Sequence, residues 1–194
     1  MAANSGTRRL VMLSGRGEDG AVACEKALAD SGADWTVLRC SWFDQNFSES
    51  FLLGPVLSGH VVLPAAAVGE PFVDADDIAD VAATVLTQAR HTGQTYDLTG
   101  PRLLTFADAV AEIAAATGRP IDYAAVPAAD YAEAMAAEGV PADVMELLTY
   151  LFSTVLDGRN DHLGDGIQQV LGRTARDFAD YARDAAATGI WNQQ

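Results

Sequence analysis

Short continuous runs of apolar residues alternate with segments of helical spacing over the first part of the chain. Runs of this kind are typical of strands that are buried on both faces of a parallel sheet. Apolar residues at every third or fourth position indicate helices with one buried face. The pattern predicts strands at 8–14, 34–40, 59–64 and 94–99, and helices at 21–31, 74–86 and 105–117.

From residue 127 onward the pattern changes to helices alone. Pro141 stands where the first residue of a long helix is expected, with apolar positions continuing to residue 156, and a last helix is predicted at 174–188. Strand–helix alternation followed by helices predicts an α/β fold. We expect one domain over residues 1–194, with the sheet in 1–126 and a mainly helical C-terminal cap in 127–194.

Composition narrows the classes of function. The chain has 194 residues, 49% of them apolar, and a formal net charge of −15 with Lys26 as its only lysine. Such a chain is a poor partner for nucleic acid, because phosphate binding requires clustered basic residues. No apolar run is long enough to span a membrane, and residues 1–9 lack the apolar stretch of a secretory signal. Two cysteines, Cys24 and Cys40, fit a reducing cytoplasm. We expect a cytoplasmic protein that binds a small molecule, with neither nucleic acid nor membrane as a partner.

A glycine-rich segment at residues 15–20 matches G-x-G-x-x-G between a predicted strand and a predicted helix. In a dinucleotide fingerprint such glycines let the backbone approach a pyrophosphate. Glu18 and Asp19 would place negative charge beside that pyrophosphate, and the next strand ends in Arg39 rather than an acidic residue. The alternative is a glycine-rich turn capped by Asp19, with Arg39 either structural or placed to favour a 2′-phosphate.

Two acidic segments resemble metal sites only superficially. The carboxylates at 74–80 fall in the first turn of a predicted helix, where they cap free N–H groups and complement the helix dipole. The loop at 157–166 lacks the alternating spacing and terminal Glu of a calcium loop, and is interpreted as solvated. The three histidines are scattered. We therefore predict no metal site.

Lys26 has two interpretations. Beside Glu25 on a helix, it fits a surface ion pair. Near the mouth of an α/β sheet, a lysine can instead hold a ribose hydroxyl or shift the pKa of a nearby hydroxyl. The usual Tyr-x-x-x-Lys pair is excluded, because residue 22 is valine.

Several motifs together resemble one protein family. Residues 25–47 match the signature E-K-x-L-x-x-S-G-x-x-x-T-x-L-R-x-x-x-[FY]-x-x-N, and the match continues at 72–79, 96–101 and 171–178. This signature resembles NmrA-like proteins, which are atypical members of the short-chain dehydrogenase/reductase superfamily. The resemblance covers nearly the whole chain and implies a reduced Rossmann-like parallel sheet with a helical C-terminal cap.

The register of the resemblance has consequences for the cofactor. A strand ending in Leu13-Ser14-Gly15 matches the fifth strand of the family's sheet, so the chain begins about a third of the way along and lacks the usual dinucleotide-binding βαβ unit. Residues 15–20 are then a coincidental match. We expect ordinary NAD(P) binding to be lost and no cofactor to be bound, with NADP(H) as the alternative.

The resemblance also assigns candidate site residues. Ser14 and Lys26 are implied as catalytic groups. The remaining cofactor-binding positions are Ser14, Gly15, Lys26, Arg39 and Ser41. The substrate pocket is implied to involve Trp42, Phe43, Asn46, Phe47 and Tyr150.

A sheet that starts at this strand leaves an apolar edge at 10–13 unpaired, which favours aggregation unless it is covered. We therefore expect a homo-oligomer, or a partner chain that supplies the missing half.

Three functions remain open at this point. The first is a small-molecule-binding protein or cofactor-independent enzyme, such as a cyclase, isomerase or dehydratase, that acts by positioning its substrate. The second is an NAD(P)H-dependent oxidoreductase whose cofactor is held in part by a partner chain. The third is a non-catalytic, redox-sensing regulatory module. The sequence names no substrate.

Overall fold

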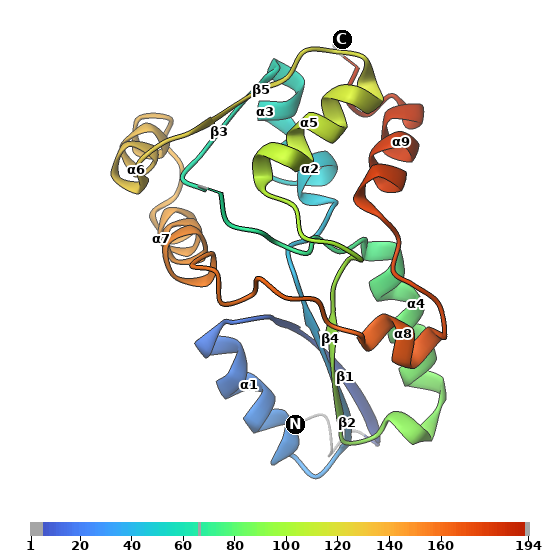
Figure 1. Cartoon of the computed structure of the whole chain (residues 1–194). Coiled ribbons are helices and arrows are strands. Elements are labelled where there is room, and N and C mark those ends of the chain that lie inside the picture. Colours follow the sequence, from blue (N-terminus) through green and yellow to red (C-terminus); the bar gives the residue numbers. More distant parts are fainter. Residues whose placement is uncertain (1–5, 66, 193–194) are drawn as a thin grey trace.

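Three parallel strands form the main sheet of the protein, for which a computed structural model describes residues 6–65 and 67–192 (Figure 1). The strands are β1 (Arg9–Gly15), β2 (Asp34–Cys40) and β4 (Gln94–Leu98), in the order β1-β2-β4. β2 is the central strand, and its Val37 and Leu38 are completely buried, as its apolar run predicts. The predicted α/β class with a parallel sheet is confirmed.

Helices cover both sides of this sheet (Figure 1). α1 (Asp19–Ala29) lies on one side, and α4 (Ala75–Thr87) and α8 (Gly166–Leu171) lie on the other. The helical spacing predicted for α4 is confirmed, because Ile78, Val81 and Val85 face the core. α1 differs, since only Glu25 among its residues is buried.

The predicted third strand is present but does not join the main sheet. β3 (His60–Leu63) pairs in parallel with β5 (Asp122–Ala125) in a separate two-stranded sheet. Two short helices, α2 (Asn46–Glu49) and α3 (Leu53–Ser58), come between β2 and β3 and lead the chain away from the main sheet (Figure 1). β5 was not predicted, because its sequence Asp-Tyr-Ala-Ala lacks the β-branched apolar residues that indicated the equally short β3.

An aromatic core joins the second sheet to the helices above the main sheet. α5 (Phe106–Thr117) begins with the predicted capping box of Thr105 and Asp108, and packs against α9 (Phe178–Thr188). The Phe106 ring lies 5.0 Å from that of Phe72 in an edge-to-face arrangement.

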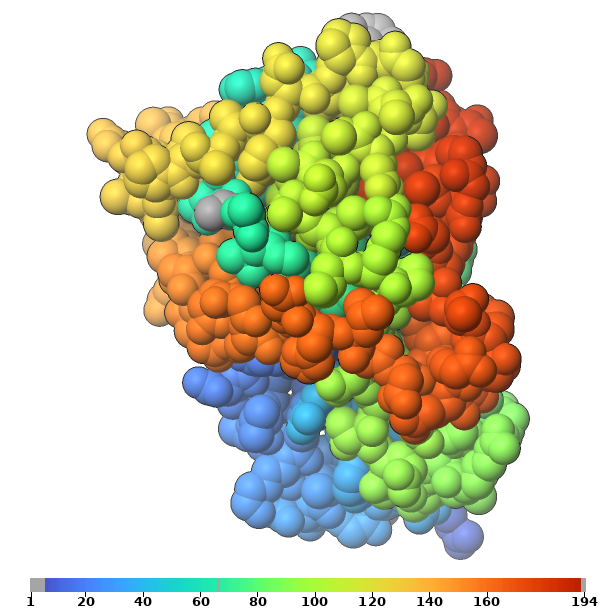
Figure 2. Space-filling model, viewed as in Figure 1, coloured from blue at the N-terminus to red at the C-terminus, as the bar shows by residue number. Residues whose placement is uncertain are grey.

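The C-terminal part departs from the predicted long helices. α6 (Ala128–Ala137) is followed by α7 (Ala142–Tyr150), for which Pro141 is the N-cap rather than the first helical residue. α7 continues directly into a π-helical turn, η3 (Leu151–Val155). Elsewhere in the chain, a short 3₁₀ turn, η2 (Ala89–His91), precedes β4. The last helix begins at Phe178 rather than at residue 174, because Asp177 caps it. In Figure 2 the orange segment after α7 crosses the molecule between the blue N-terminal elements and the elements above. The division of the domain at residue 126 stays a prediction. The first five and the last two residues of the predicted domain lie outside the described residues.

Candidate functional site

A cleft opens where β1 and β2 end. Its volume is about 310 Å³, and it is lined by the end of β1 and the following turn, the end of β2 and the following segment, and η3 with the loop after it. In open parallel sheets, ligands bind beyond the carboxyl ends of the strands. The cleft therefore lies where this fold places a ligand.

Aromatic rings form one wall of the cleft. The ring of Trp42 lies 5.2 Å from that of Phe106, edge to face, and 5.2 Å from that of Phe152. Phe51, which also lines the cleft, lies 6.4 Å from Trp42. Rings fixed by several neighbours form a rigid, apolar surface that suits a flat ligand.

A buried chain of hydrogen bonds backs the polar end of the cleft. The Ser14 hydroxyl donates to Glu25 Oε1 at 2.5 Å, and Arg39 donates to both carboxylate oxygens of Glu25. These hydrogen bonds from Arg39, more than the one from Ser14, lower the pKa of Glu25. Glu25 is therefore ionised at neutral pH, and the Ser14 oxygen, with its proton committed to Glu25, can accept a hydrogen bond from a ligand in the cleft.

A buried arginine ties the C-terminal loop to the strand ends. The Arg16 guanidinium donates to Ser41 Oγ at 3.0 Å and to the carbonyl of His162 at 3.0 Å. In return the side chain of Asn160 donates to the Arg16 carbonyl at 3.1 Å. The loop at 157–166 is largely exposed, as its interpretation as solvated implies, but its buried Asn160 closes one end of the cleft.

The glycine-rich turn does not form a phosphate cradle. A Cβ atom on Gly15 would lie 1.7 Å from Oε1 of Glu18, so a carboxyl group occupies the space that the glycine leaves open. Asp19 is the first residue of α1, and its N–H donates to the Tyr150 hydroxyl at 3.3 Å. Asp19 therefore does not cap the helix as predicted; Glu18 takes the N-cap position without a side-chain hydrogen bond.

The structure brings together many of the residues predicted for the site. Those that line the cleft are Ser14, Gly15, Ser41, Trp42, Phe43 and Asn46.

Four predicted residues lie elsewhere. Lys26 is exposed on α1, where its ammonium pairs with Asp30 at 2.8 Å rather than with Glu25. Arg39 does not line the cleft but pairs with Glu25, the carboxylate that accepts the hydrogen bond from Ser14. Phe47 is fully buried in the aromatic core. Tyr150 joins α7 to the start of α1. Neither Lys26 nor Phe47 lines the cleft, and the roles that the resemblance implies for them stay predictions.

Sequence reasoning missed three polar residues of the cleft: Arg16, Glu18 and Asn160. Arg16 and Glu18 lie inside the glycine motif, which indicates a role for the backbone and not for the side chains between the glycines. Asn160 carried no usable signal, since only the folding of the distant loop places it at the cleft.

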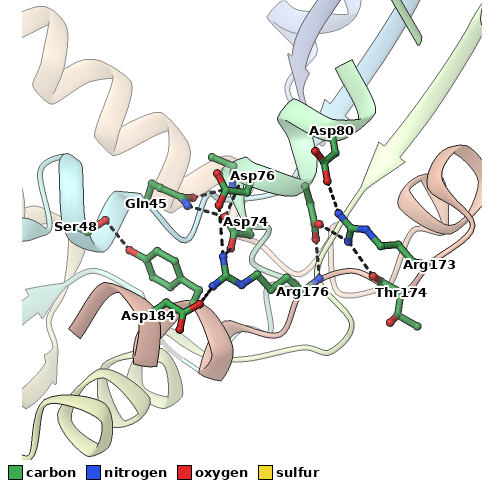
Figure 3. Close-up of polar contacts among 12 residues, drawn as sticks. Gln45, Ser48, Asp74, Asp76, Asp80, Arg173, Thr174, Arg176 and Asp184 are labelled. Atoms are coloured by element: carbon green, nitrogen blue, oxygen red, sulfur yellow. Dashed lines mark hydrogen bonds and ion pairs between the residues drawn. The ribbon is translucent and has the colours of Figure 1, made fainter. Parts of the chain in front are cut away.

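The acidic segment at the start of α4 is paired with arginines (Figure 3). Asp74 caps the helix by accepting from the Asp76 N–H at 3.0 Å, as predicted, and also pairs with Arg176 at 2.8 Å. Arg173 pairs with Asp77 at 2.5 Å and with Asp80 at 2.7 Å. These contacts join α4 to the segment before α9. No group of metal-ligating side chains is arranged to hold an ion in the described ranges.

Within residues 6–65 and 67–192, no helix combines the length and the apolar character that crossing a bilayer requires.

Comparison with known proteins gives clear relatives, although no family model matches the chain. It is 31% identical over 163 residues to the NAD(P)H azoreductase of Xenophilus azovorans, covering 84% of this chain and 57% of that protein. It is 30% identical over 195 residues to the uncharacterized oxidoreductase YesF of Bacillus subtilis, covering 97% and 68%. The matched part of the chain thus corresponds to 57% of the length of the azoreductase and to 68% of the length of YesF.

Solved structures share the fold. The NADPH-dependent quinone oxidoreductase of Escherichia coli in complex with NADPH matches with a TM-score of 0.81 at 23% identity, over 94% of this chain and 67% of that one. The negative transcriptional regulator NmrA in complex with NAD matches with a TM-score of 0.64 at 16% identity, over 97% and 69%.

These findings contradict the expectation of a protein without a cofactor. The azoreductase is named for NAD(P)H, and the quinone oxidoreductase structure contains NADPH. The cleft suits one end of such a cofactor: it offers an aromatic wall and the oxygens of Ser14 and Ser41 to a flat ring with a carboxamide group. It does not suit the phosphates, because the Glu18 carboxyl fills the space over Gly15.

Proposed function

The chain belongs to the NmrA-like family of atypical short-chain dehydrogenases/reductases, and on that premise we propose that it forms the nicotinamide- and substrate-binding part of an NAD(P)H-dependent oxidoreductase. The observation that carries this proposal is the cleft at the carboxyl ends of β1 and β2, with an aromatic wall on one side and hydroxyl groups on the other. When bound, the reduced nicotinamide supplies a hydride.

The residues of the cleft have separate tasks in this proposal. Trp42 and Phe51 pack against the flat rings and exclude water. Ser14 and Ser41 hold the carboxamide, and the charges behind them, Glu25 and Arg16, keep both hydroxyls in place. The substrate must then lie against the ring within the remaining space, which favours flat acceptors.

We propose that a partner chain holds the rest of the cofactor along β1. Among the described strands, β1 pairs only with β2, and Leu13 on β1 is 50% exposed. Val22 on the neighbouring α1 is 53% exposed. A further parallel strand beside β1 would cover both side chains and would place its own carboxyl end, with phosphate-binding groups, next to the cleft.

Cofactor binding tests the first part of the proposal. We expect both NADPH and reduced nicotinamide mononucleotide to bind the purified protein in a calorimetric titration, because both carry the nicotinamide end that the cleft contacts. Trp42→Leu is expected to weaken binding about tenfold through the loss of ring packing. Trp35→Leu, at the opposite end of β2, serves as the control and should bind normally.

The outcomes separate the alternatives. Binding followed by NADPH oxidation in the presence of a quinone supports the oxidoreductase. Binding without turnover of any acceptor indicates a redox-sensing regulator instead. If neither nucleotide produces heat or raises the melting temperature, the nicotinamide site does not exist.

The state of assembly tests the second part. We expect light scattering after size exclusion to give a mass well above the 20.4 kDa of one chain. Leu13→Lys should shift the protein toward the monomer, because it places a charge at the covered edge. Leu86→Lys on α4, where the leucine is 48% exposed, should leave the mass unchanged. A wild-type monomer at micromolar concentration would show that β1 is not covered by a second copy of this chain.

A further inference from the structure

The carboxyl group of Glu18 lies over the end of β1. A Cβ atom on Gly15 would lie 1.7 Å from Glu18 Oε1 and 2.4 Å from its Cδ, so the carboxyl occupies the place of the absent side chain. The backbone of Gly15 has no positive φ angle, unlike Gly17 with a φ of 73°. Gly15 is therefore needed for space and not for conformation, and the space is used by a carboxyl group that lines the cleft.

The Glu18 carboxyl is not committed to another group of the protein. Glu18 is the N-cap of α1, but its side chain makes no capping hydrogen bond. No hydrogen bond or ion pair of this carboxyl is found among the described residues, whereas Ser14 and Arg16 beside it are both engaged. A half-buried acid without a partner, facing a ligand cleft, is available to the ligand.

Partial burial favours the protonated form of this group and raises the pKa of Glu18 above its ordinary value of 4.5. The nearby arginines do not cancel this rise in the pKa of Glu18, because each is paired with another carboxylate. Arg159, whose guanidinium reaches the Gly17 carbonyl, is paired with Asp157, and Arg16 is held by Ser41 and the Asp97 carboxylate. Other titratable groups on the surrounding elements are Asp19, Cys24 and Lys26 on α1, Glu25, which is bonded to Arg39, Tyr150 on α7, Cys40 in the cleft lining, and Asp161 and His162 on the loop after Asn160.

We propose that Glu18 is the catalytic acid of the cleft, donating the proton that completes reduction of the acceptor; this rests on the proposed NAD(P)H-dependent activity. One atom of the acceptor's conjugated system receives a hydride, carrying two electrons, from the reduced nicotinamide. The O–H bond of Glu18 breaks, and its proton forms a new O–H or N–H bond on the acceptor. The carboxylate then takes a proton from solvent before the next turnover. Gly15 is the positioning residue that makes room for the carboxyl.

This role can be tested with two acceptors, of which one needs a proton as well as a hydride and the other needs only the hydride. A neutral quinone needs a hydride and a proton, whereas a cationic triphenylmethane dye is neutralised by the hydride alone. In the assembly in which the protein is isolated, Glu18→Gln should lower kcat for the quinone about 100-fold, the usual contribution of a general acid. The rate with the dye and the binding of NADPH should stay unchanged. Glu133→Gln, an exposed residue of α6, should change neither rate.

Gly15→Ala tests the positioning without removing the acid. The new methyl group meets only the far end of a flexible side chain, so the protein should fold while the carboxyl is displaced into solvent. We expect the same selective loss with the quinone. NMR titration of labelled glutamate carboxyls should show the pKa of Glu18 above 4.5 in the wild type and closer to 4.5 in the variant.

Three results would overturn the inference. Equal loss with both acceptors would show that Glu18 acts in binding, and an unaffected quinone rate in Glu18→Gln would show that another group is the acid. An unshifted pKa of Glu18 in both proteins would remove its physical basis. A wild type that neither binds NADPH nor reduces either acceptor would overturn the oxidoreductase itself, and is thereby distinguishable from failure of the Glu18 role alone.

Discussion

Arg16→Met is expected to lower the free energy of unfolding by about 2–4 kcal/mol, the cost of leaving buried hydrogen-bond acceptors without their charged donor. Arg16 is only 4% exposed, and its guanidinium serves Ser41, the carbonyl of His162 and, at 3.7 Å, the carboxylate of Asp97. Methionine fills a similar volume but satisfies none of these acceptors. The loop that closes the cleft should therefore detach from the strand ends, and urea titration at pH 7 would measure the loss.

A second arginine of the same region provides the control for this prediction. Arg159 donates to the carbonyl of Gly17 and pairs with Asp157, but it is exposed. Arg159→Met should cost less than about 1 kcal/mol, because exposed ion pairs contribute little. If both variants lose the same small amount, the network around Arg16 does not hold the loop.

Glu70→Gln is expected to remove a pH dependence of stability that amounts to about 3 kcal/mol at most. Glu70 is 1% exposed, and neither carboxylate oxygen has a hydrogen-bond partner among the described residues. Burial raises the pKa of Glu70 from 4.5 to about 7, with nearby Arg16 and the Asn160 side chain offsetting part of the effect. Because the folded state holds the proton more tightly than the unfolded chain, this contribution is complete below pH 4.5 and is lost as the pH rises to about 7.

The measurement is the difference in unfolding free energy between Glu70→Gln and the wild type across pH 4.5 to 8. Relative to the wild type, the variant should gain stability as the pH rises through this window, because glutamine stays neutral. Comparing the two proteins at each pH cancels other buried acids, among them Asp44, whose pKa is also raised by burial. A difference that does not change with pH would mean that Glu70 is ionised, with a normal pKa, in the folded protein.

Local patterns in the sequence predicted the elements that depend on neighbours along the chain. The apolar run of β2, the capping box before α5 and the cap of α4 by Asp74 are present as expected, because each depends on residues a few positions apart. The failures came where the local pattern does not distinguish the conformations. β5 lacks β-branched apolar residues, unlike the equally short β3. α7 continues into the π-helical η3, whose apolar residues, some of which line the cleft, had predicted a plain helix.

The candidate site was predicted in part. The motif resemblance pointed to Ser14, Ser41 and Trp42, which line the cleft, and also to Lys26, which does not. The expectation of a protein without a cofactor was wrong, because a relative of this chain is named an NAD(P)H azoreductase and a solved structure of the same fold contains NADPH.

By itself, then, the sequence determined the alternation of strands and helices in the main sheet, the caps of α4 and α5, the acidic charge and the family. Only the tertiary structure decided which charges are buried and how they pair. Glu25 turns inward to Arg39 instead of outward to Lys26, and Asn160 meets Arg16 across 144 residues of chain. The reason is physical: a side chain's burial and its partner depend on elements brought together by packing, and nothing in the local spacing of residues records that contact.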